Sequence, residues 1–341
     1  MTVQQALARL LDGHDLTRDE ARAVMNEVME GEATPAQIGG FLVALRLKGE
    51  TADEITGCAE AMRAHALTVT PKRDDLVDTA GTGGDGARTI NISTAAALVA
   101  AAAGAGVAKH GNRAVSSASG SADVLEALGF RLELPPARIE RSIDELGFGF
   151  LFAPTHHPAM RHAAPVRREL AARTVFNVLG PLTNPAGARA QVVGVYAPAL
   201  VRTVADVLAQ LGARRAFVVH GAGGIDELSP VGPNLVCEVA GGRVRRREID
   251  PLDLGVPRCD PADLAGGSPA ENAAKIRAVF EGSNGGARSA VLLNAAGAIA
   301  ASGHARNLRE GLAAATEAVD SGAAGARLEK LIAFTRAKVA A

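Results

Sequence analysis

The sequence contains no tryptophan and a single tyrosine among its 341 residues. Aromatic platforms on which single-stranded nucleic acid stacks are therefore scarce. It also lacks an excess of charge of either sign, because 36 Lys and Arg residues balance 37 Asp and Glu residues to a formal net charge of -1. Such a balance creates no global field that would draw the chain to nucleic acid or to an anionic membrane. We therefore expect neither as a partner.

Cysteines and long apolar runs are also few. Cys58, Cys237 and Cys259 form no C-x-x-C pair, which argues against a disulfide framework or a zinc ribbon and favours a reducing cytoplasm. The most apolar stretch, residues 95–108, is rich in Ala and Gly and is shorter than the ~20 residues of a membrane span. Residues 1–15 lack the basic start and apolar core of a signal peptide. We therefore expect a cytoplasmic protein.

Residues 1–72 carry only helical signals. Apolar residues recur at helical spacing over residues 3–11 and 21–29, and Thr34-Pro35 begins a further helix. Thr17 with Glu20, and Thr51 with the glutamate three positions on, form capping boxes at the start of two helices. This pattern predicts a small N-terminal helical domain over residues 1–72.

From residue 76 onward, short β-rich runs alternate with helical segments. The predicted strands are residues 76–79, 107–109, 149–152, 192–196, 216–220 and 290–293. Such alternation is typical of an α/β fold with a mostly parallel central sheet, and we assign it to residues 73–341. Residues 158–170 are predicted to form one charged helix, and the segment near 158–180 is expected to join the helical domain. Residues 243–247 are predicted to be a solvated strand edge.

A glycine-rich segment, residues 78–86, follows the first predicted strand. Gly81, Gly83 and Gly86 match G-x-G-x-x-G, but a dinucleotide site also needs an acidic residue at the end of the next strand. That strand ends in Lys109-His110, which disfavours a nicotinamide site. A Walker A loop is excluded, since no Gly-Lys-Ser/Thr closes the run.

The glycine-rich segment is better interpreted as a cradle for an anion. Glycines let backbone N–H groups approach phosphate oxygens closely. Asn91, Ser93 and Thr94 stand at the predicted N-terminus of the following helix, where free N–H groups and the helix dipole favour anions. The alternative is that Asn91 or Ser93 only caps the helix. Capping alone does not require a glycine-rich loop before it.

A second polar loop, residues 109–123, also leaves a strand and enters a helix. It carries Lys109, Arg113, the amide of Asn112 and several serines. An unstructured linker of this length inside a compact domain is uncommon unless it has a function. Parallel strands bring such loops together at their carboxyl ends. We therefore expect the two loops to border one cleft, which suits a ligand with phosphates at both ends.

A third loop contains two adjacent carboxylates, Asp226 and Glu227, behind a glycine-rich turn and a predicted strand. Mg²⁺ is usually held by one or two carboxylates together with substrate phosphates. The alternative is a solvated acidic pair, which is the commoner fate of Asp-Glu. The position of this pair after a strand favours a metal site.

Taken in order, these segments resemble the signatures of the anthranilate phosphoribosyltransferases. The resemblance covers nearly the whole chain, and its motifs are residues 81–85, 91–94, 109–113, 119–123, 173–185, 226–227, 294–296 and 320–324. It implies transfer of a 5-phosphoribosyl group from phosphoribosyl pyrophosphate to anthranilate, within tryptophan biosynthesis. It also implies a homodimer formed through the helical domains and two Mg²⁺ per subunit.

The resemblance also assigns roles to individual residues. The implied donor-binding residues are Gly81, Gly84, Asp85, Thr89, Asn91, Ile92, Ser93, Thr94, Lys109, His110, Gly111, Asn112, Arg113, Ala114, Val115, Ser116, Ser117 and Ser121. The implied metal residues are Ser93, Asp226 and Glu227. The implied acceptor-binding residues are Gly81, Asn112 and Arg167, and His157 is expected to shape the acceptor pocket. No general base is assigned, although His110 is a candidate.

The sequence departs from the family pattern at Ala118, where many members carry Lys or Arg. Two other functions stay open at this point. The first is a nucleoside phosphorylase of similar fold, although the second loop of such enzymes lacks Lys-His-Gly-Asn-Arg. The second is a non-catalytic relative that binds nucleic acid, against which the balanced charge and the presence of Asn112 and Arg167 both argue.

Overall fold

A computed structural model describes residues 1–114 and 118–337. Its centre is a seven-stranded sheet in the order β3-β2-β1-β4-β5-β6-β7. Strands β1 to β5 pair in parallel, and β6 and β7 are antiparallel additions at one edge. The strands are β1 (Leu76–Gly81), β2 (Gly106–Gly111), β3 (Phe148–Phe152), β4 (Ala190–Gly194), β5 (Arg215–His220), β6 (Asn234–Ala240) and β7 (Arg243–Ile249).

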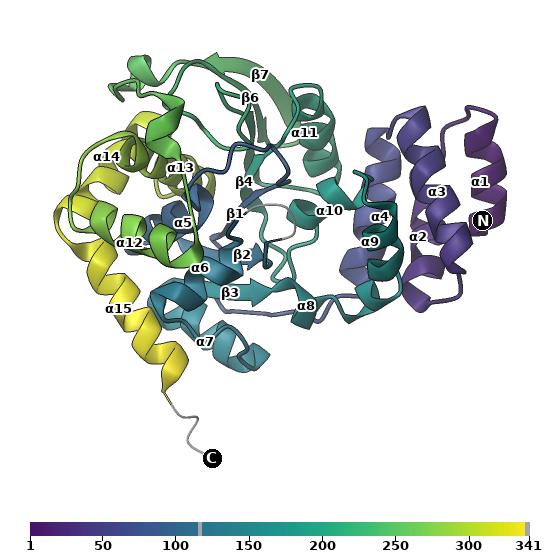
Figure 1. The fold of residues 1–341 in the computed structure, drawn as a ribbon, viewed down its shortest axis with the longest axis horizontal. Coiled ribbons are helices and arrows are strands. Elements are labelled where there is room, and N and C mark those ends of the chain that lie inside the picture. The colour runs from purple at the N-terminus through teal and green to yellow at the C-terminus, as the bar shows by residue number, and fades with distance from the viewer. Residues whose placement is uncertain (115–117, 338–341) are drawn as a thin grey trace.

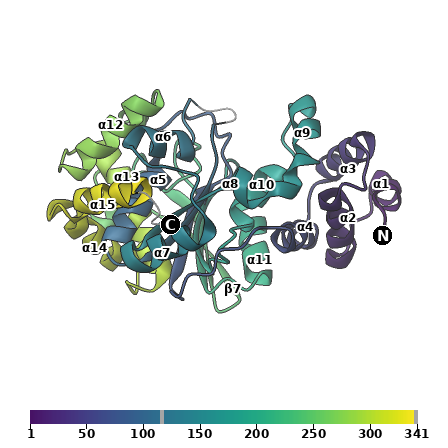
Figure 2. The same ribbon diagram turned by 90° about the horizontal axis from the view of Figure 1, so that it is seen from below.

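Helices surround the sheet and form a separate bundle at the N-terminal end (Figure 1). The helices are α1 (Val3–Leu11), α2 (Arg18–Glu30), α3 (Pro35–Lys48), α4 (Ala52–Ala64), α5 (Ile92–Ala102), α6 (Ser121–Leu128), α7 (Pro136–Leu146), α8 (Ala153–His156), α9 (Ala164–Leu170), α10 (Phe176–Leu182), α11 (Leu200–Gln210), α12 (Pro269–Phe280), α13 (Gly286–Ser302), α14 (Leu308–Asp320), α15 (Ala323–Arg336) and the 3-10 helices η1 (Pro158–Arg161), η2 (Pro251–Leu254) and η3 (Pro261–Leu264). Figure 2 shows α1–α4 and α9 at one end, with α10 and α11 between them and the sheet.

The two faces of the sheet belong to different hydrophobic cores. Val192 and Val219 pack with α5, α13 and α14 on one face, whereas Val193 and Val218 pack with α10, α11 and the N-terminal helices on the other. Neighbouring residues of a strand point to opposite faces, so both faces of β4 and β5 are buried. The apolar core of the N-terminal bundle is therefore continuous with one face of the sheet.

Threonine capping boxes begin all four N-terminal helices. The boxes predicted at Thr17 and Thr51 are confirmed, and Thr2 and Thr34 form two more with Gln in place of Glu. Each box satisfies two backbone N–H groups that the first turn leaves free. These caps explain why four short helices can start so close together along the chain. The domain boundary between residues 72 and 73 stays a prediction.

Two predicted elements were wrong. Residues 290–293 lie inside α13, which is buried along most of its length; a short apolar run fully inside a core does not reveal whether it is strand or helix. Residues 158–170 form η1 and then α9 rather than one helix. Strand β6 was not predicted, whereas β7 is the exposed edge strand that its arginines indicated. No helix in the described ranges is long and apolar enough to cross a membrane.

The order of the strands reverses between β1 and β4, which are paired neighbours in the sheet. From β1 the chain adds β2 and β3 on one side and then returns to add β4 and β5 on the other. At such a reversal the loops after the two central strands diverge, and a crevice opens at their carboxyl ends. Gly81, at the end of β1, pairs with Gly194, at the end of β4.

The buried carboxylate of Glu54 offers a test of what holds the helical bundle together. It accepts hydrogen bonds from the backbone N–H of Leu16 (2.9 Å) and of Thr51 (2.8 Å) and from Lys48 Nζ (3.0 Å). Glu54→Ala should lower the free energy of unfolding by about 3 kcal/mol, because it leaves buried donors unpaired. Thr51→Ala, which removes one cap, should cost about 1 kcal/mol. Urea unfolding followed by circular dichroism would measure both, and equal losses would contradict this interpretation.

Candidate active site

The glycine-rich loop after β1 is held at the carboxyl ends of β1 and β4. Thr82 donates its N–H to the Gly194 carbonyl (2.9 Å), and Gly83 donates its N–H to Asp226 Oδ2 (2.7 Å). Gly83 and Gly84 have φ values of 66° and 74°, a left-handed conformation that favours glycine. The loop predicted to cradle an anion therefore lies at the topological switch point of the sheet.

Asn91 stands at the N-cap of α5, but its side chain makes no capping hydrogen bond. Instead its amide nitrogen donates to the Ser119 carbonyl (3.0 Å), and its amide oxygen accepts from the Ser119 hydroxyl (3.1 Å) and from Asn272 (2.9 Å). Asn91 thus ties the helix N-terminus to the second loop. Of the N–H groups of the first turn, that of Ile92 donates to the Ile90 carbonyl (2.7 Å) and that of Ser93 donates to Glu227 Oε1 (3.0 Å), so this turn is available to an anion only in part.

The three residues predicted to hold metal come together. Glu227 Oε1 accepts the Ser93 N–H (3.0 Å), and the Ser93 hydroxyl also bonds to this carboxylate. Asp226 is 9% exposed and its backbone N–H donates to Asp85 Oδ2 (3.3 Å). The described residues show no preformed cluster of three or more His, Cys, Asp or Glu side chains that would hold a metal alone. Asp226, Glu227 and the Ser93 hydroxyl supply only oxygen ligands, which is the donor set that Mg²⁺ prefers.

Burial changes the ionisation of this pair. It raises the pKa of Asp226 to about 7, and the nearby charge of Asp85 adds to the effect. It likewise raises the pKa of Glu227 to about 8, with a further contribution from Asp226, while Lys109 opposes the shift. Desolvation disfavours a charged carboxylate, and so does a neighbouring carboxylate. The pair therefore holds protons at neutral pH unless a cation compensates its charge.

Lys109 lies deeper than the sequence suggested. It is 2% exposed, and its Nζ donates to the Thr79 carbonyl (2.5 Å). Burial lowers its pKa, whereas the charges of Asp78 and Glu227 raise it. In this structure the ammonium is therefore buried near the acidic pair and donates its hydrogen bond to the backbone of β1. Its predicted contact with the donor phosphates stays a prediction.

The rest of the second loop is partly described. Gly111 abuts Ser121, whose Oγ would lie 2.2 Å from a Cβ at that position, and the Ser121 hydroxyl bonds to the backbone of Asn112. Arg113 forms ion pairs with Asp123 (3.1 Å) and Glu126. Thr89 pairs with Ala265 in an isolated bridge on the first loop. The predicted donor residues Val115, Ser116 and Ser117 lie outside the described residues, and Ala118 is exposed.

Two histidine rings, His110 and His157, lie with centroids 5.0 Å apart. His110 Nδ1 is 3.2 Å from the Gly180 carbonyl, and His157 bonds to the Thr183 carbonyl. A carbonyl only accepts, so the ring nitrogen that contacts it carries the proton. The Nε2 atoms of both rings are buried and have no hydrogen-bond partner among residues 1–114 and 118–337. Burial lowers the pKa of His110 to about 3 and that of His157 to about 4, so both rings are neutral and offer Nε2 as an acceptor.

Arg167 lies on α9, away from the phosphate loops. Its guanidinium carbon is 5.0 Å from the centroid of the Phe176 ring, and burial lowers its pKa. Among the described residues its side chain makes no hydrogen bond or ion pair, whereas the adjacent Arg168 is exposed to solvent. A half-buried guanidinium without an acidic partner is a ready site for a carboxylate.

Sequence reasoning missed three buried polar residues that support the loops. Asp78 accepts from the His110 N–H (3.2 Å) and from Asn184 Nδ2 (2.7 Å), and burial raises its pKa to about 6. Asn294 on α13 accepts the Leu228 N–H (2.9 Å) and donates to the Leu228 carbonyl (2.7 Å). The signal that could have found Asp78 is a carboxylate inside an apolar strand, since buried charges are rare unless partnered.

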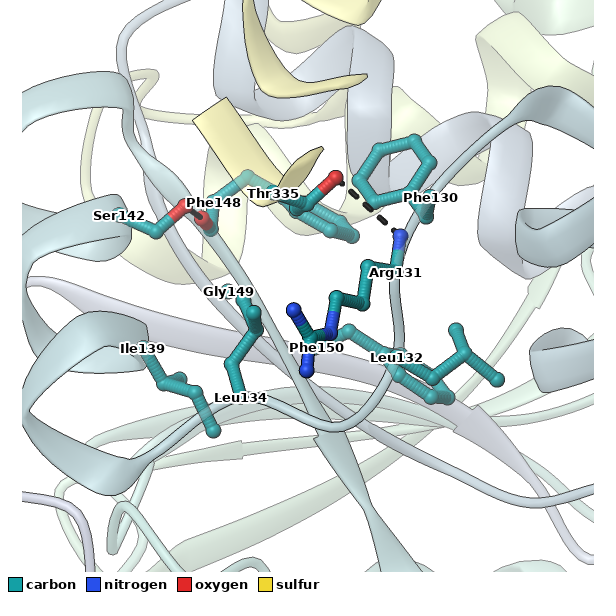
Figure 3. A pocket seen from close by; sticks show the side chains of 10 residues that line it. All are labelled: Phe130, Arg131, Leu132, Leu134, Ile139, Ser142, Phe148, Gly149, Phe150 and Thr335. Atoms are coloured by element: carbon teal, nitrogen blue, oxygen red, sulfur yellow. Dashed lines mark hydrogen bonds between the residues drawn. The ribbon is translucent and has the colours of Figure 1, made fainter. Parts of the chain in front are cut away.

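Two pockets lie away from these loops. One holds only about 10 Å³, room for about one water; Figure 3 shows its lining residues, which are Phe130, Arg131, Leu132, Leu134, Ile139, Ser142, Phe148, Gly149, Phe150 and Thr335. The other, of about 510 Å³, lies among η2, η3, α13 and α14. Neither is lined by a described residue of the three loops predicted to bind phosphate and metal. The candidate site is therefore defined by the loops at the switch point.

Comparison with known proteins identifies the class to which this fold and site belong. Residues 4–66 match the model of the glycosyl transferase family, helical bundle domain, and residues 73–325 match that of the glycosyl transferase family, a/b domain. The chain is 57% identical over 333 residues to an anthranilate phosphoribosyltransferase of Anaeromyxobacter sp. (strain K), with 98% of each chain covered. It is 54% identical to that of Moorella thermoacetica, covering 96% of this chain and 97% of the other. The chain belongs to the anthranilate phosphoribosyltransferase family.

Solved structures of anthranilate phosphoribosyltransferases support the same family assignment. The anthranilate phosphoribosyltransferase of Thermus thermophilus is 50% identical, has a TM-score of 0.93 and matches over 97% of this chain and 99% of its own. That of Saccharomyces cerevisiae, in complex with PRPP and Mg, is 28% identical with a TM-score of 0.88, over 98% and 97%. The same yeast enzyme has been solved with 4-fluoroanthranilate. These likenesses support the main interpretation over a nucleoside phosphorylase or a nucleic-acid-binding relative.

The buried acidic pair predicts an unusual dependence of stability on pH. In metal-free protein the free energy of unfolding should fall as pH rises from about 4 to about 8. The folded state keeps protons on Asp226 and Glu227 up to their pKa values of about 7 and about 8, whereas the unfolded chain has released them by about pH 4–5. Unfolding therefore releases protons in this window, and higher pH favours it. Below the window the contribution is fully present.

Each carboxyl is expected to lose about 4 kcal/mol of stabilisation across the window, because its pKa in the folded protein lies roughly three units above that in the unfolded chain and each unit is worth about 1.4 kcal/mol. Glu227→Gln keeps the shape of the side chain and removes one of the two titrations, so its profile should be flatter than that of the wild type. Unfolding in urea with EDTA at several pH values would measure both, and Glu248→Gln on the exposed edge strand is the matched control. Parallel profiles for wild type and Glu227→Gln would contradict the raised pKa.

Proposed function

We propose that this chain transfers the 5-phosphoribosyl group from phosphoribosyl pyrophosphate to anthranilate, giving N-(5-phosphoribosyl)anthranilate and pyrophosphate, in tryptophan biosynthesis. One observation carries the proposal: the glycine loop, the α5 N-terminus and the Asp226–Glu227 pair converge at the β1–β4 switch point, in a chain with close relatives of that name. Mixing the protein with the donor, Mg²⁺ and anthranilate should make the anthranilate fluorescence disappear. Persistent fluorescence, with nucleoside cleavage by phosphate instead, would refute the proposal.

The donor-binding set inferred from the sequence is retained as part of this proposal. Its support is that the glycine loop and the first turn of α5 both bond to the Asp226–Glu227 pair, through the N–H groups of Gly83 and Ser93, and that Asn91 links the start of α5 to Ser119 in the second loop. The reaction breaks the bond between ribose C1 and pyrophosphate, so negative charge grows on the leaving group. N–H groups of the glycine loop that no group of the described protein occupies would stabilise that charge, because the loop holds them in place before the reaction.

Attack by the acceptor needs positioning more than a base. The amine of anthranilate is neutral at pH 7, so it can attack before it loses a proton. His110, the candidate base, has a pKa lowered to about 3 by burial and by His157, which makes it a weak proton acceptor. Its Nε2, like that of His157, can instead accept a hydrogen bond from the amine N–H. We therefore assign both rings to orientation of the acceptor and assign no general base.

The acidic pair is proposed to hold two Mg²⁺ per subunit with Ser93. The support is chemical: an oxygen-only donor set, with carboxyl pKa values raised by burial that a bound cation would lower again. When bound, Mg²⁺ would neutralise charge on the pyrophosphate as it departs. Asp226 and Glu227 contribute the anionic ligands, and the Gly83 N–H and the Ser93 N–H fix their orientation.

The acceptor pocket is proposed to comprise Gly81, Asn112, His157 and Arg167. Anthranilate carries a carboxylate beside its amine, so the pocket needs a cation away from the pyrophosphate. Arg113 is already engaged with Asp123 and Glu126, and Lys109 is buried beside the acidic pair. Arg167 has no acidic partner in the described structure and is therefore the cation free to bind the carboxylate.

We also propose a cytoplasmic homodimer formed through the helical domains. Leu11 at the end of α1 and Leu47 on α3 are 71% and 82% exposed. Val43 and Leu47 are four residues apart on α3 and so share one face of the helix. Apolar side chains gathered on the bundle would be covered by a second copy of the same surface.

The metal assignment predicts the behaviour of a double variant. Asp226→Asn with Glu227→Gln should remain folded, because neutral isosteres need no compensating cation. Turnover should fall steeply, and half-maximal rate should require more Mg²⁺, since the ligands lose their charge. A magnesium titration of the rate would measure this, with Asp253→Asn plus Glu248→Gln as a charge-matched control on exposed positions. Wild-type turnover at ordinary Mg²⁺ would rule out the assignment.

Arg167→Ala should raise the Michaelis constant for anthranilate by roughly 10- to 150-fold, because a charge-assisted bond is worth about 1.5–3 kcal/mol and each ~1.4 kcal/mol is tenfold. The donor constant should barely change. Arg168→Ala, on the exposed side of the same helix, should change neither constant. If the two variants behave alike in steady-state kinetics, Arg167 does not bind the carboxylate.

A further inference from the structure

Arg173 reaches the glycine loop from the segment that joins α9 to α10. Its Nη2 donates to the Gly84 carbonyl, and its guanidinium carbon lies 4.2 Å from the centroid of the Tyr196 ring. Tyr196, the one tyrosine of the chain, follows β4, and its backbone N–H donates to Thr82 Oγ1 (3.1 Å). A cation over an aromatic face is attracted to it, and a flat guanidinium stacks well there. None of the roles assigned above involves Arg173 or Tyr196.

The contact fixes the direction of one peptide group. In a planar trans peptide the C=O and the N–H point in opposite directions. With the Gly84 carbonyl turned toward Arg173, the Asp85 N–H must point to the other side of the loop. This N–H makes no hydrogen bond within the described part of the chain. Gly84 has a φ of 74°, and a glycine peptide can rotate easily unless something restrains it.

The segment that carries Arg173 is itself under conformational strain. Ala171, between α9 and Arg173, has a φ of 47°, which costs a residue with a Cβ free energy and persists only when its surroundings enforce it. Its N–H donates to the Arg167 carbonyl, closing α9. The arm that presents the proposed acceptor cation, Arg167, is thereby linked through Arg173 to the proposed donor loop.

We propose that Arg173 is a positioning residue that locks the Gly84–Asp85 peptide with its N–H free for the phosphates of the donor, while the Tyr196 ring supports its guanidinium. The substrate named here rests on the proposed function. The lock itself is a property of the ligand-free protein. Its loss should raise the donor Michaelis constant and loosen the loop even when no ligand is present.

The test combines kinetics with proteolysis. Arg173→Gln should raise the donor Michaelis constant by about 5- to 50-fold, since it removes a charge-assisted bond, which solvent weakens in part because Arg173 is exposed. Turnover at saturating donor and the acceptor constant should change much less. In ligand-free protein, trypsin should cut after Arg88, within the same loop, about tenfold faster, because cleavage follows the population of open loop. Tyr196→Leu should shift both readouts in the same direction by less.

Two control variants test whether the effect is specific to the Arg173 guanidinium and the Tyr196 ring. Arg168→Gln removes a neighbouring exposed cation from the same arm, and Tyr196→Phe keeps the ring; both should match the wild type. Unchanged donor constant and unchanged cleavage in Arg173→Gln would overturn the proposal. A raised donor constant with unchanged cleavage would also overturn it, in favour of direct contact between Arg173 and the donor. An inactive wild type would refute the proposed function. The rate of cleavage after Arg88 would then still test whether Arg173 restrains the Gly84–Asp85 peptide.

Discussion

The site depends on how closely the loop that carries Asp226 approaches the ends of β1 and β4. A Cβ on Gly194 would lie 1.5 Å from the Asp226 carbonyl oxygen, and one on Gly81 would lie 2.3 Å from Asp226 Oδ2. These two glycines are paired across the switch point. Because neither has a side chain, together they leave the space that Asp226 occupies. Any larger residue would push the acidic loop outward and separate Glu227 from the Ser93 N–H.

This close approach explains the electrostatics of the site. An acidic pair pressed against backbone loses solvent, which raises its pKa values, and the buried Lys109 compensates only part of the charge. A donor rich in phosphate would be repelled by two ionised carboxylates. Protons on the pair would remove that repulsion, and a divalent cation held by Asp226 and Glu227, as proposed, would replace those protons. Under the proposed assignment, the burial of Asp226 and Glu227 would couple the binding of the cation to that of the donor.

Much of this arrangement could be predicted from local sequence. Five of the six predicted strands are present, and Gly81 to Asp85, Ser93 and Asp226–Glu227 meet as expected, because glycine-rich turns after parallel strands fall at one edge of the sheet. Residues 290–293 were assigned wrongly because α13 is buried on nearly all sides and shows no helical period. The depth of Lys109 and the supporting roles of Asp78 and Asn184 could not be predicted, since their partners are distant in sequence.

Three asparagines connect the loops of the site to one another and to the sheet, where other parts of the chain use ion pairs. Asn91 joins the first loop to the second, Asn184 donates to both Asp78 and the Ala108 carbonyl, and Asn294 bonds the N–H and carbonyl of Leu228 beside Glu227. An amide can donate and accept at once, so it can hold two backbone segments without adding charge. The proposed site, which would bind a polyanion and cations, would benefit from this neutrality. Supporting ion pairs would compete for the same ligands, whereas buried amides fix the loops and leave the charged groups available.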